Sequence, residues 1–136
     1  DNVLLLNGDT YFDVDYSDLH EVLNKKGALC AVALKQMERF DRYGTVETDE
    51  EGRIISFLEK SFREKGLINT GVYVINRNRF LSRDWPEKFS FEKDFLEKET
   101  GARSLLGVVS DGYFIDIGIP SDYEKAQADF KIRFPA

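Results

Sequence analysis

The sequence has little cysteine, little basic charge and no long hydrophobic run. Its single cysteine, Cys30, excludes an internal disulfide and fits a reducing compartment, so we expect a cytoplasmic protein. No apolar run approaches the ~20 residues of a membrane-spanning helix, and the opening Asp1-Asn2-Val3 is not typical of a signal peptide, so no membrane partner is expected. Lys and Arg number 19 against 25 Asp and Glu, a net charge of −6. This balance argues against nucleic acid as a partner, because binding to phosphate backbones needs clustered basic residues.

What is present fits one globular domain. The chain has 136 residues, of which 42% are hydrophobic and 32% charged, a composition that excludes a disordered chain. At 15.7 kDa, a folded monomer exposes about 7,300 Å² and buries roughly two-thirds of the surface of its unfolded chain. A hydrophobic core of ordinary size is therefore expected.

The pattern of apolar residues predicts an α/β fold with a mixed sheet, because strands and helices alternate at both ends around a β-meander. Strands are expected at residues 3–6, 29–34, 45–48, 53–58, 67–75, 105–109 and 113–117. Helices or helical turns are expected at residues 16–25, 76–81 and 91–98, and from residue 120 onward. The continuous apolar run from Val3 to Leu6 predicts a strand buried on both faces, as in a parallel sheet. Ser17 is the expected cap of the first helix, and Ser121 with Glu124 has the spacing of a capping box at the last.

Two acidic residues each follow an apolar strand. Asp9 comes after Leu6-Asn7-Gly8, and Asp116 comes after Phe114-Ile115. Ligands of open α/β sheets bind beyond the carboxyl ends of strands, where a hard carboxylate suits a Mg²⁺ ion that carries a phosphate. Gly8 would let the chain turn and a ligand approach closely. The alternative is that each carboxylate only bonds to amides of its own turn, and a shared metal site requires that the two strands be neighbours.

Polar residues and glycines at three further places are candidate ligand-binding residues. Glu59 and Lys60 end a strand, where they either form a surface hairpin end or serve sugar hydroxyls and a phosphate. Asn69 opens an apolar strand, and its amide can both donate to and accept from hydroxyls. Gly71 inside that strand predicts a bulge or a close backbone approach. Gly44 begins a strand, where its bare N–H could meet a ligand.

Four other residues resemble functional groups but have simpler interpretations. Asp13 and Asp15 form the Asp-x-Asp pattern of metal-dependent glycosyltransferases, yet they precede a helix, where aspartate commonly caps. His20 has no second His or Cys at ligand spacing and is expected on a helix surface. Cys30 lies in an apolar strand and is expected to be a small core residue.

Taken in order, these segments resemble the sugar-phosphate nucleotidyltransferase family over essentially the whole chain. The matching segments are Leu6-Asn7-Gly8-Asp9-Thr10, Arg42-Tyr43-Gly44-Thr45-Val46-Glu47, Phe57-Leu58-Glu59-Lys60, Leu67-Ile68-Asn69-Thr70-Gly71-Val72-Tyr73 and residues 114–123. Within the family, residues 7–15, 89–97 and 111–114 look most like the D-glycero-α-D-manno-heptose 1-phosphate and mannose-1-phosphate guanylyltransferases.

The resemblance implies a Rossmann-like, GT-A-like mixed sheet flanked by helices. It also implies transfer of a nucleotidyl group, GMP from GTP, to a sugar 1-phosphate, giving a nucleotide-diphosphate sugar and pyrophosphate. By the same resemblance, Asp9 and Asp116 match the two Mg²⁺-binding positions. The implied substrate-binding residues are Gly8, Gly44, Glu59, Lys60, Asn69, Thr70 and Gly71, with Lys60 near the sugar 1-phosphate.

One part of the family pattern has no counterpart in this sequence. The first half of the family carries a Gly-rich loop that cradles the triphosphate and reads the base, and no segment here matches it. Residues 1–136 are therefore expected to be the C-terminal, sugar-binding part, inactive alone, with the N-terminal nucleotide-binding part absent. Such a chain would leave Val3 to Leu6 exposed on one side, to be covered by that part, by a partner or by a second copy in a homo-oligomer.

Two alternative functions stay open at the level of the sequence. The first is a catalytically inactive sugar-phosphate-binding or regulatory module of the same fold. The second is a metal-dependent glycosyltransferase that uses Asp13 and Asp15.

Overall fold

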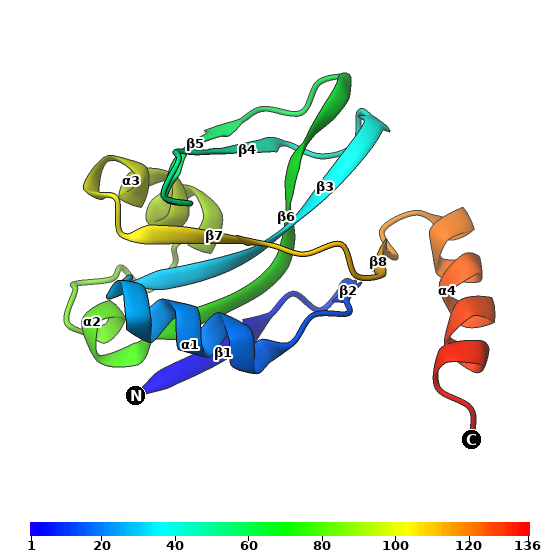
Figure 1. Ribbon diagram of the computed structural model, residues 1–136, viewed down its shortest axis with the longest axis horizontal. Helices are drawn as coiled ribbons and strands as arrows, with labels where there is room; N and C mark the ends of the chain where they lie inside the picture. The colour runs from blue at the N-terminus through cyan, green and yellow to red at the C-terminus, as the bar shows by residue number, and fades with distance from the viewer.

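The computed structural model describes residues 1–136 as a mixed α/β structure (Figure 1). The strands are β1 (Asn2–Leu6), β2 (Thr10–Phe12), β3 (Cys30–Phe40), β4 (Thr45–Thr48), β5 (Ile54–Leu58), β6 (Arg63–Asn76), β7 (Leu105–Val109) and β8 (Phe114–Asp116). The helices are α1 (Tyr16–Lys26), α2 (Arg77–Leu81), the π-helical η1 (Phe91–Leu96), α3 (Glu97–Glu99), the 3₁₀-helical η2 (Thr100–Ala102) and α4 (Pro120–Arg133). None of these helices combines the length and apolar character that a membrane crossing requires.

Six strands form one sheet and two form a separate ribbon. The large sheet has the order β5-β4-β6-β3-β7, and β1 pairs with β6 as well. All of its pairings are antiparallel except that of β3 with β7. Strands β2 and β8 pair with each other and lead to α4, which stands beside the ribbon and away from the sheet (Figure 1). The expected mixed sheet is therefore confirmed.

Helices cover both faces of the sheet because successive residues of a strand point to opposite faces. In β3, Cys30, Val32 and Leu34 belong to one core cluster, which includes Phe95 of η1. The intervening Ala31 and Ala33 belong to a second cluster, with α1 residues packed against them. The small alanine side chains let α1 approach the sheet closely, whereas the other face holds larger side chains. The sheet is thus flanked by helices, as the sequence predicts.

Strand β1 differs from the sequence expectation. The run from Val3 to Leu6 does not lie in a parallel sheet with both faces buried. It pairs only with β6, in antiparallel register, and its four apolar side chains are 37–49% exposed. A continuous apolar run shows that a segment can be buried, but it does not show which other segments lie beside it.

Two helix starts also differ from the expected caps. Asp15, not Ser17, caps α1, and its Oδ1 accepts a hydrogen bond of 2.8 Å from the Ser17 N–H. Helix α4 begins one residue before Ser121, at Pro120, with Ile119 at the N-cap and no side-chain cap. Proline suits the first helical position because its fixed φ is helical and it has no N–H to satisfy there, so no capping box forms.

Three local features were not expected from the sequence. The ribbon strand β2 is absent from the predicted elements, β3 continues past residue 34 to Phe40, and β6 begins at Arg63 rather than at residue 67.

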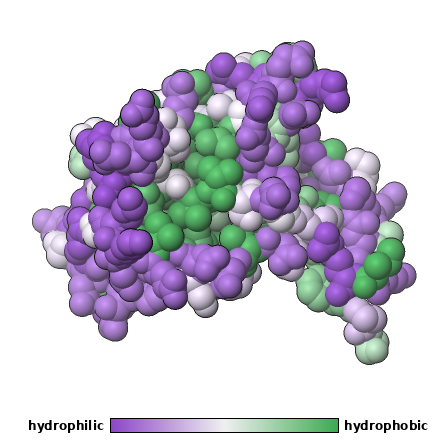
Figure 2. Space-filling model, in the orientation of Figure 1, coloured by the Kyte–Doolittle hydropathy of each residue, from purple (hydrophilic) through white to green (hydrophobic).

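The predicted helix at residues 91–98 opens with the π-helical turns of η1, which Ser90 caps by accepting from the Lys93 N–H. Apolar surface gathers over the middle of the face that carries β7 and again near the end of α4 (Figure 2).

Candidate active site

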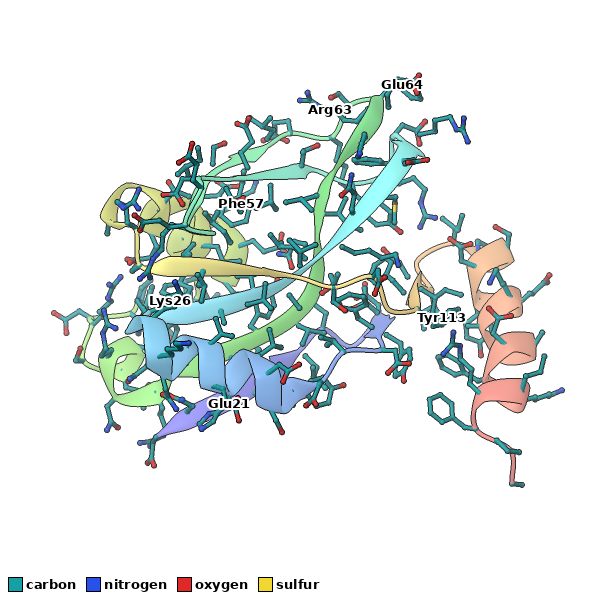
Figure 3. All side chains as sticks on the ribbon, viewed as in Figure 1. Glu21, Lys26, Phe57, Arg63, Glu64 and Tyr113 are labelled. Atoms are coloured by element: carbon teal, nitrogen blue, oxygen red, sulfur yellow. The ribbon has the colours of Figure 1, made fainter.

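One cleft of about 600 Å³ lies where the β1–β2 turn, the β3–β4 turn and the end of β5 meet β6, β8 and η1. Six residues that the sequence singled out line it, namely Asp9, Gly44, Glu59, Lys60, Asn69 and Asp116. Phe57 of the β4–β5 hairpin, labelled in Figure 3, contributes to its apolar wall. Residues from six separate stretches of the chain thus converge on a single site.

The two aspartates of the site lie on neighbouring stretches of backbone. Strand β2 pairs with β8 so that Thr10 is opposite Asp116, and the Asp9 carbonyl accepts a 3.0 Å hydrogen bond from the Ile117 N–H. Asp116 Oδ1 accepts a 2.7 Å hydrogen bond from the Gly118 N–H, and Asp116 lines the cleft together with Asp9. The pairing of β2 with β8 therefore brings both aspartates to the same cleft.

The cleft carries more negative than positive side chains. Its acidic residues are Asp9, Glu59, Glu92, Glu97 and Asp116, and its basic residues are Arg42, Lys60 and Lys93. Arg42 is ion-paired with Asp122, whereas Lys60 and Lys93 make no ion pair. A phosphate would be repelled by this excess of carboxylates unless an additional cation accompanied it.

The donor set suits a metal ion that shares its ligands with a substrate. No group of three or more His, Cys, Asp or Glu residues is arranged to hold a metal ion by itself. Mg²⁺ commonly takes only one or two protein carboxylates and completes its shell with water and substrate phosphates. Asp9 and Asp116 fit that pattern, so the site could hold Mg²⁺ together with a phosphate but is not a closed protein cage.

Asn69 is held in one orientation at the floor of the cleft. Its Oδ1 accepts a 2.9 Å hydrogen bond from the Gly71 N–H, and its Nδ2 donates a 2.8 Å hydrogen bond to the Tyr73 hydroxyl. Tyr73 is fully buried, and burial raises the pKa of its hydroxyl, which stays protonated at neutral pH. The sequence pointed to Asn69 but not to the buried tyrosine that contacts it.

Comparison with known proteins decides the family. The sequence model of the nucleotidyl transferase family matches residues 1–132 of the chain. The chain belongs to the nucleotidyl transferase family.

Two curated relatives carry the same name, D-glycero-alpha-D-manno-heptose 1-phosphate guanylyltransferase. The protein from Aneurinibacillus thermoaerophilus is 48% identical over 96% of this chain and 56% of its own length. The protein from Campylobacter jejuni is 49% identical over 88% of this chain and 52% of its own length. The chain thus spans about half the length of these relatives.

A solved structure shows the same fold. The crystal structure of HddC from Yersinia pseudotuberculosis superposes with a TM-score of 0.82 at 35% identity, covering 96% of this chain and 56% of that one. The complex of the same protein with GMP-PN superposes with a TM-score of 0.78.

Several residues that line the cleft of this nucleotidyl transferase chain were not predicted from the sequence. Tyr43 precedes Gly44 and is half-buried against Phe114, with ring centroids 6.0 Å apart. Burial, and then the nearby charge of Asp116, raises the pKa of its hydroxyl. Glu92, Lys93 and Glu97 line the wall formed by η1 and the start of α3. In the sequence, these charged residues alternate with Phe91 and Phe95, a pattern that predicts an exposed helix face. The pattern does not predict that this face lines a cleft.

Three predicted substrate-binding residues, Gly8, Thr70 and Gly71, are not among the residues that line the cleft. The Thr70 hydroxyl is fully buried and donates to the Ala33 carbonyl over 2.7 Å. Gly71 has a φ of +80°, and a Cβ there would lie 2.5 Å from Nδ2 of Asn7. The pairing of β3 with β6 shifts register beside it, so the expected bulge is present.

The residues with simpler interpretations behave as expected. Asp15 caps α1, and Asp13 lies 3.6 Å from Arg133 of α4 in an ion pair. Neither aspartate lines the cleft. His20 is exposed on α1, and Cys30 is fully buried in β3.

Proposed function

We propose that the protein carrying this chain transfers GMP from GTP to a sugar 1-phosphate, giving a nucleotide-diphosphate sugar and pyrophosphate. The observation that carries the proposal is that Asp9 and Asp116 open into the same cleft as Glu59, Lys60 and Asn69. The names of the relatives at 48% and 49% identity favour a heptose 1-phosphate as the acceptor. The GMP-PN complex of HddC supports a guanine nucleotide as the donor.

The chemistry requires alignment and charge neutralisation more than proton transfer. An ionised oxygen of the sugar 1-phosphate attacks the α-phosphorus of GTP, and the bond from this phosphorus to the oxygen bridging to the β-phosphate breaks. Pyrophosphate leaves with that oxygen, and because the nucleophile already carries its charge, no general base is needed. Lys60 would hold the acceptor phosphate as a point charge, and Glu59 and Asn69 would bind hydroxyls of the sugar.

We also propose Mg²⁺ as the cofactor, held by Asp9 and Asp116. When bound there, it supplies positive charge to the phosphates in a cleft whose own side chains are mainly acidic. The carboxylates of the exposed Asp9 and the partly exposed Asp116 would be its protein ligands.

The chain itself would supply the acceptor side of the reaction. It contains the proposed sugar and metal residues but no Gly-rich loop for the triphosphate. We propose that residues outside the 136 bind the nucleotide, so the isolated chain should not turn over.

Pyrophosphate release from GTP and D-glycero-α-D-manno-heptose 1-phosphate tests the function and the metal site together. In the complete gene product, Asp9→Asn and Asp116→Asn should each lower kcat/KM by at least about a hundredfold, since each removes a charged ligand. Removing divalent ions with a chelator should abolish release, and Mg²⁺ should restore it. Asp13→Asn is the matched control and should retain activity.

Near-normal rates in either the Asp9 or the Asp116 variant would contradict the metal assignment. Pyrophosphate release by the isolated 136-residue chain would contradict the proposal that residues outside the 136 bind the nucleotide. Absence of release by the complete gene product with any sugar 1-phosphate would favour the inactive binding module instead.

A further inference from the structure

The amide of Asn69 has a defined donor and acceptor end. The Gly71 N–H can only donate, so the atom of Asn69 that it meets at 2.9 Å must be the carbonyl oxygen. The amide nitrogen must then be the atom that lies 2.8 Å from the Tyr73 hydroxyl. Because an amide nitrogen carries two hydrogens, one N–H remains after the bond to Tyr73, and Asn69 lines the cleft.

The surroundings of Tyr73 keep its hydroxyl in place. In β6 it is paired with Leu5 of β1 on one side and Val32 of β3 on the other, and it is fully buried. Its ring meets that of Phe91 edge-on, with centroids 4.9 Å apart. A ring fixed on this many sides cannot follow a moving partner, so the Asn69 amide must adjust to the hydroxyl and not the reverse.

We propose that Tyr73 is a positioning residue that acts through Asn69 and makes this asparagine a hydrogen-bond donor to a hydroxyl oxygen of the acceptor sugar. The inference rests on the proposed function, since it concerns the same acceptor. The terminal torsion of an asparagine side chain is broad, so a single contact to Gly71 would leave the amide free to tilt. The second contact, to Tyr73, removes that freedom before the sugar binds.

A double-mutant cycle tests whether Tyr73 acts through Asn69. The readouts are the calorimetric affinity of the complete gene product for D-glycero-α-D-manno-heptose 1-phosphate, and KM for this sugar phosphate and for GTP. Tyr73→Phe should weaken binding of the sugar phosphate about five- to tenfold, the loss of one net hydrogen bond, and raise its KM while changing KM for GTP much less. Asn69→Ala should weaken binding at least as much, and adding Tyr73→Phe to Asn69→Ala should change nothing further.

Tyr113→Phe is the matched control. It also removes a tyrosine hydroxyl from a hydrogen bond, here 2.6 Å long to Asp129. Tyr113 faces α4 and lies outside the cleft (Figure 3). Removing the Tyr113 hydroxyl should leave the affinity for the sugar phosphate unchanged.

Three results would overturn the inference while leaving the proposed function intact. They are an unchanged affinity in Tyr73→Phe, additive losses in the double variant, and an equal rise in KM for GTP. A wild-type protein that binds no sugar phosphate would overturn the proposed function and this inference together.

If Tyr73→Phe fails to fold, Asn69→Asp provides the test, because it keeps an acceptor for the Gly71 N–H but replaces the remaining donor with an acceptor. Unchanged binding in that variant would equally contradict the inference.

Discussion

Gly44 shows how closely the backbone is packed at the wall of the cleft. A Cβ at this position would lie 2.6 Å from the carbonyl oxygen of Leu58, which is backbone and cannot rotate away. Leu58 directly precedes Glu59 and Lys60, so any displacement of its carbonyl moves both proposed substrate residues. The glycine is thus required by the protein itself, whatever ligand binds beside it.

We therefore expect Gly44→Ala to impair acceptor binding through the backbone. The clash should destabilise the fold by about 1–3 kcal/mol and raise KM for the sugar 1-phosphate. Gly101→Ala is the control, because a Cβ there would meet nothing within 4 Å. Thermal unfolding and steady-state kinetics of the two variants check the expectation, and an unchanged KM in Gly44→Ala would contradict it.

At the scale of elements, a buried carboxylate joins two helices to the sheet. Glu99 ends α3 and forms an ion pair with Arg83, which follows α2. The Ser104 hydroxyl, just before β7, donates to Glu99 over 2.5 Å. The Arg83 guanidinium, and next the Ser104 hydroxyl, hold the pKa of the Glu99 carboxyl below its usual value of 4.5 despite burial.

This arrangement predicts a pH-dependent contribution to stability. Because the pKa of Glu99 is lowered by folding, its contribution is complete above the usual pKa of 4.5 and disappears as pH falls through the lower folded value. Glu99→Gln should therefore lower the free energy of unfolding by about 1–2 kcal/mol at neutral pH. The difference from the wild type should shrink below about pH 4.5.

Denaturant unfolding at a series of pH values measures this difference. The control is Glu87→Gln, since Glu87 is exposed and makes no hydrogen bond or ion pair. A loss of stability in Glu99→Gln that stays constant into acid would show that shape, not charge, is what the carboxylate contributes.

At the scale of the whole molecule, the chain exposes more surface than its mass requires. Its accessible surface is 8445 Å², against about 7,300 Å² for a typical monomer of this size. Part of the excess is the row of apolar side chains on β1, which has a neighbouring strand on one side only. An open edge with apolar side chains is prone to pair with another chain.

We expect the isolated 136-residue chain to associate as its concentration rises. The double variant Leu4→Lys, Leu6→Lys should remain monomeric, because charge on an edge strand opposes pairing. Leu81→Lys is the control, since Leu81 is an apolar residue that is 55% exposed but belongs to α2 and not to the edge strand. Light scattering after gel filtration reports the mass, and a wild-type chain that stays monomeric throughout would contradict the expectation.

Much of the fold and of the site could be predicted from the sequence. The local spacing of apolar residues identifies nearly every strand and helix, because burial on one face imposes its own period on the chain. The order of Asp9, Gly44, Glu59, Lys60, Asn69 and Asp116 was enough to indicate a site, and all six line the cleft.

What the sequence could not reveal depends on pairings between distant segments. The antiparallel pairing of β1 with β6 and the absence of Thr70 from the cleft follow from which strands lie side by side, and no local pattern encodes that. Similarly, the sequence around Glu92 and Lys93 indicates only an exposed helix face, whereas in the structure η1 forms a wall of the cleft. The residue types and their chemistry could be known from the sequence, because these are properties of single side chains. The contact of Tyr73 with Asn69 and the position of Asp9 beside Asp116 became known from the folded chain, because they depend on the bulge in β6 and on the pairing of β2 with β8.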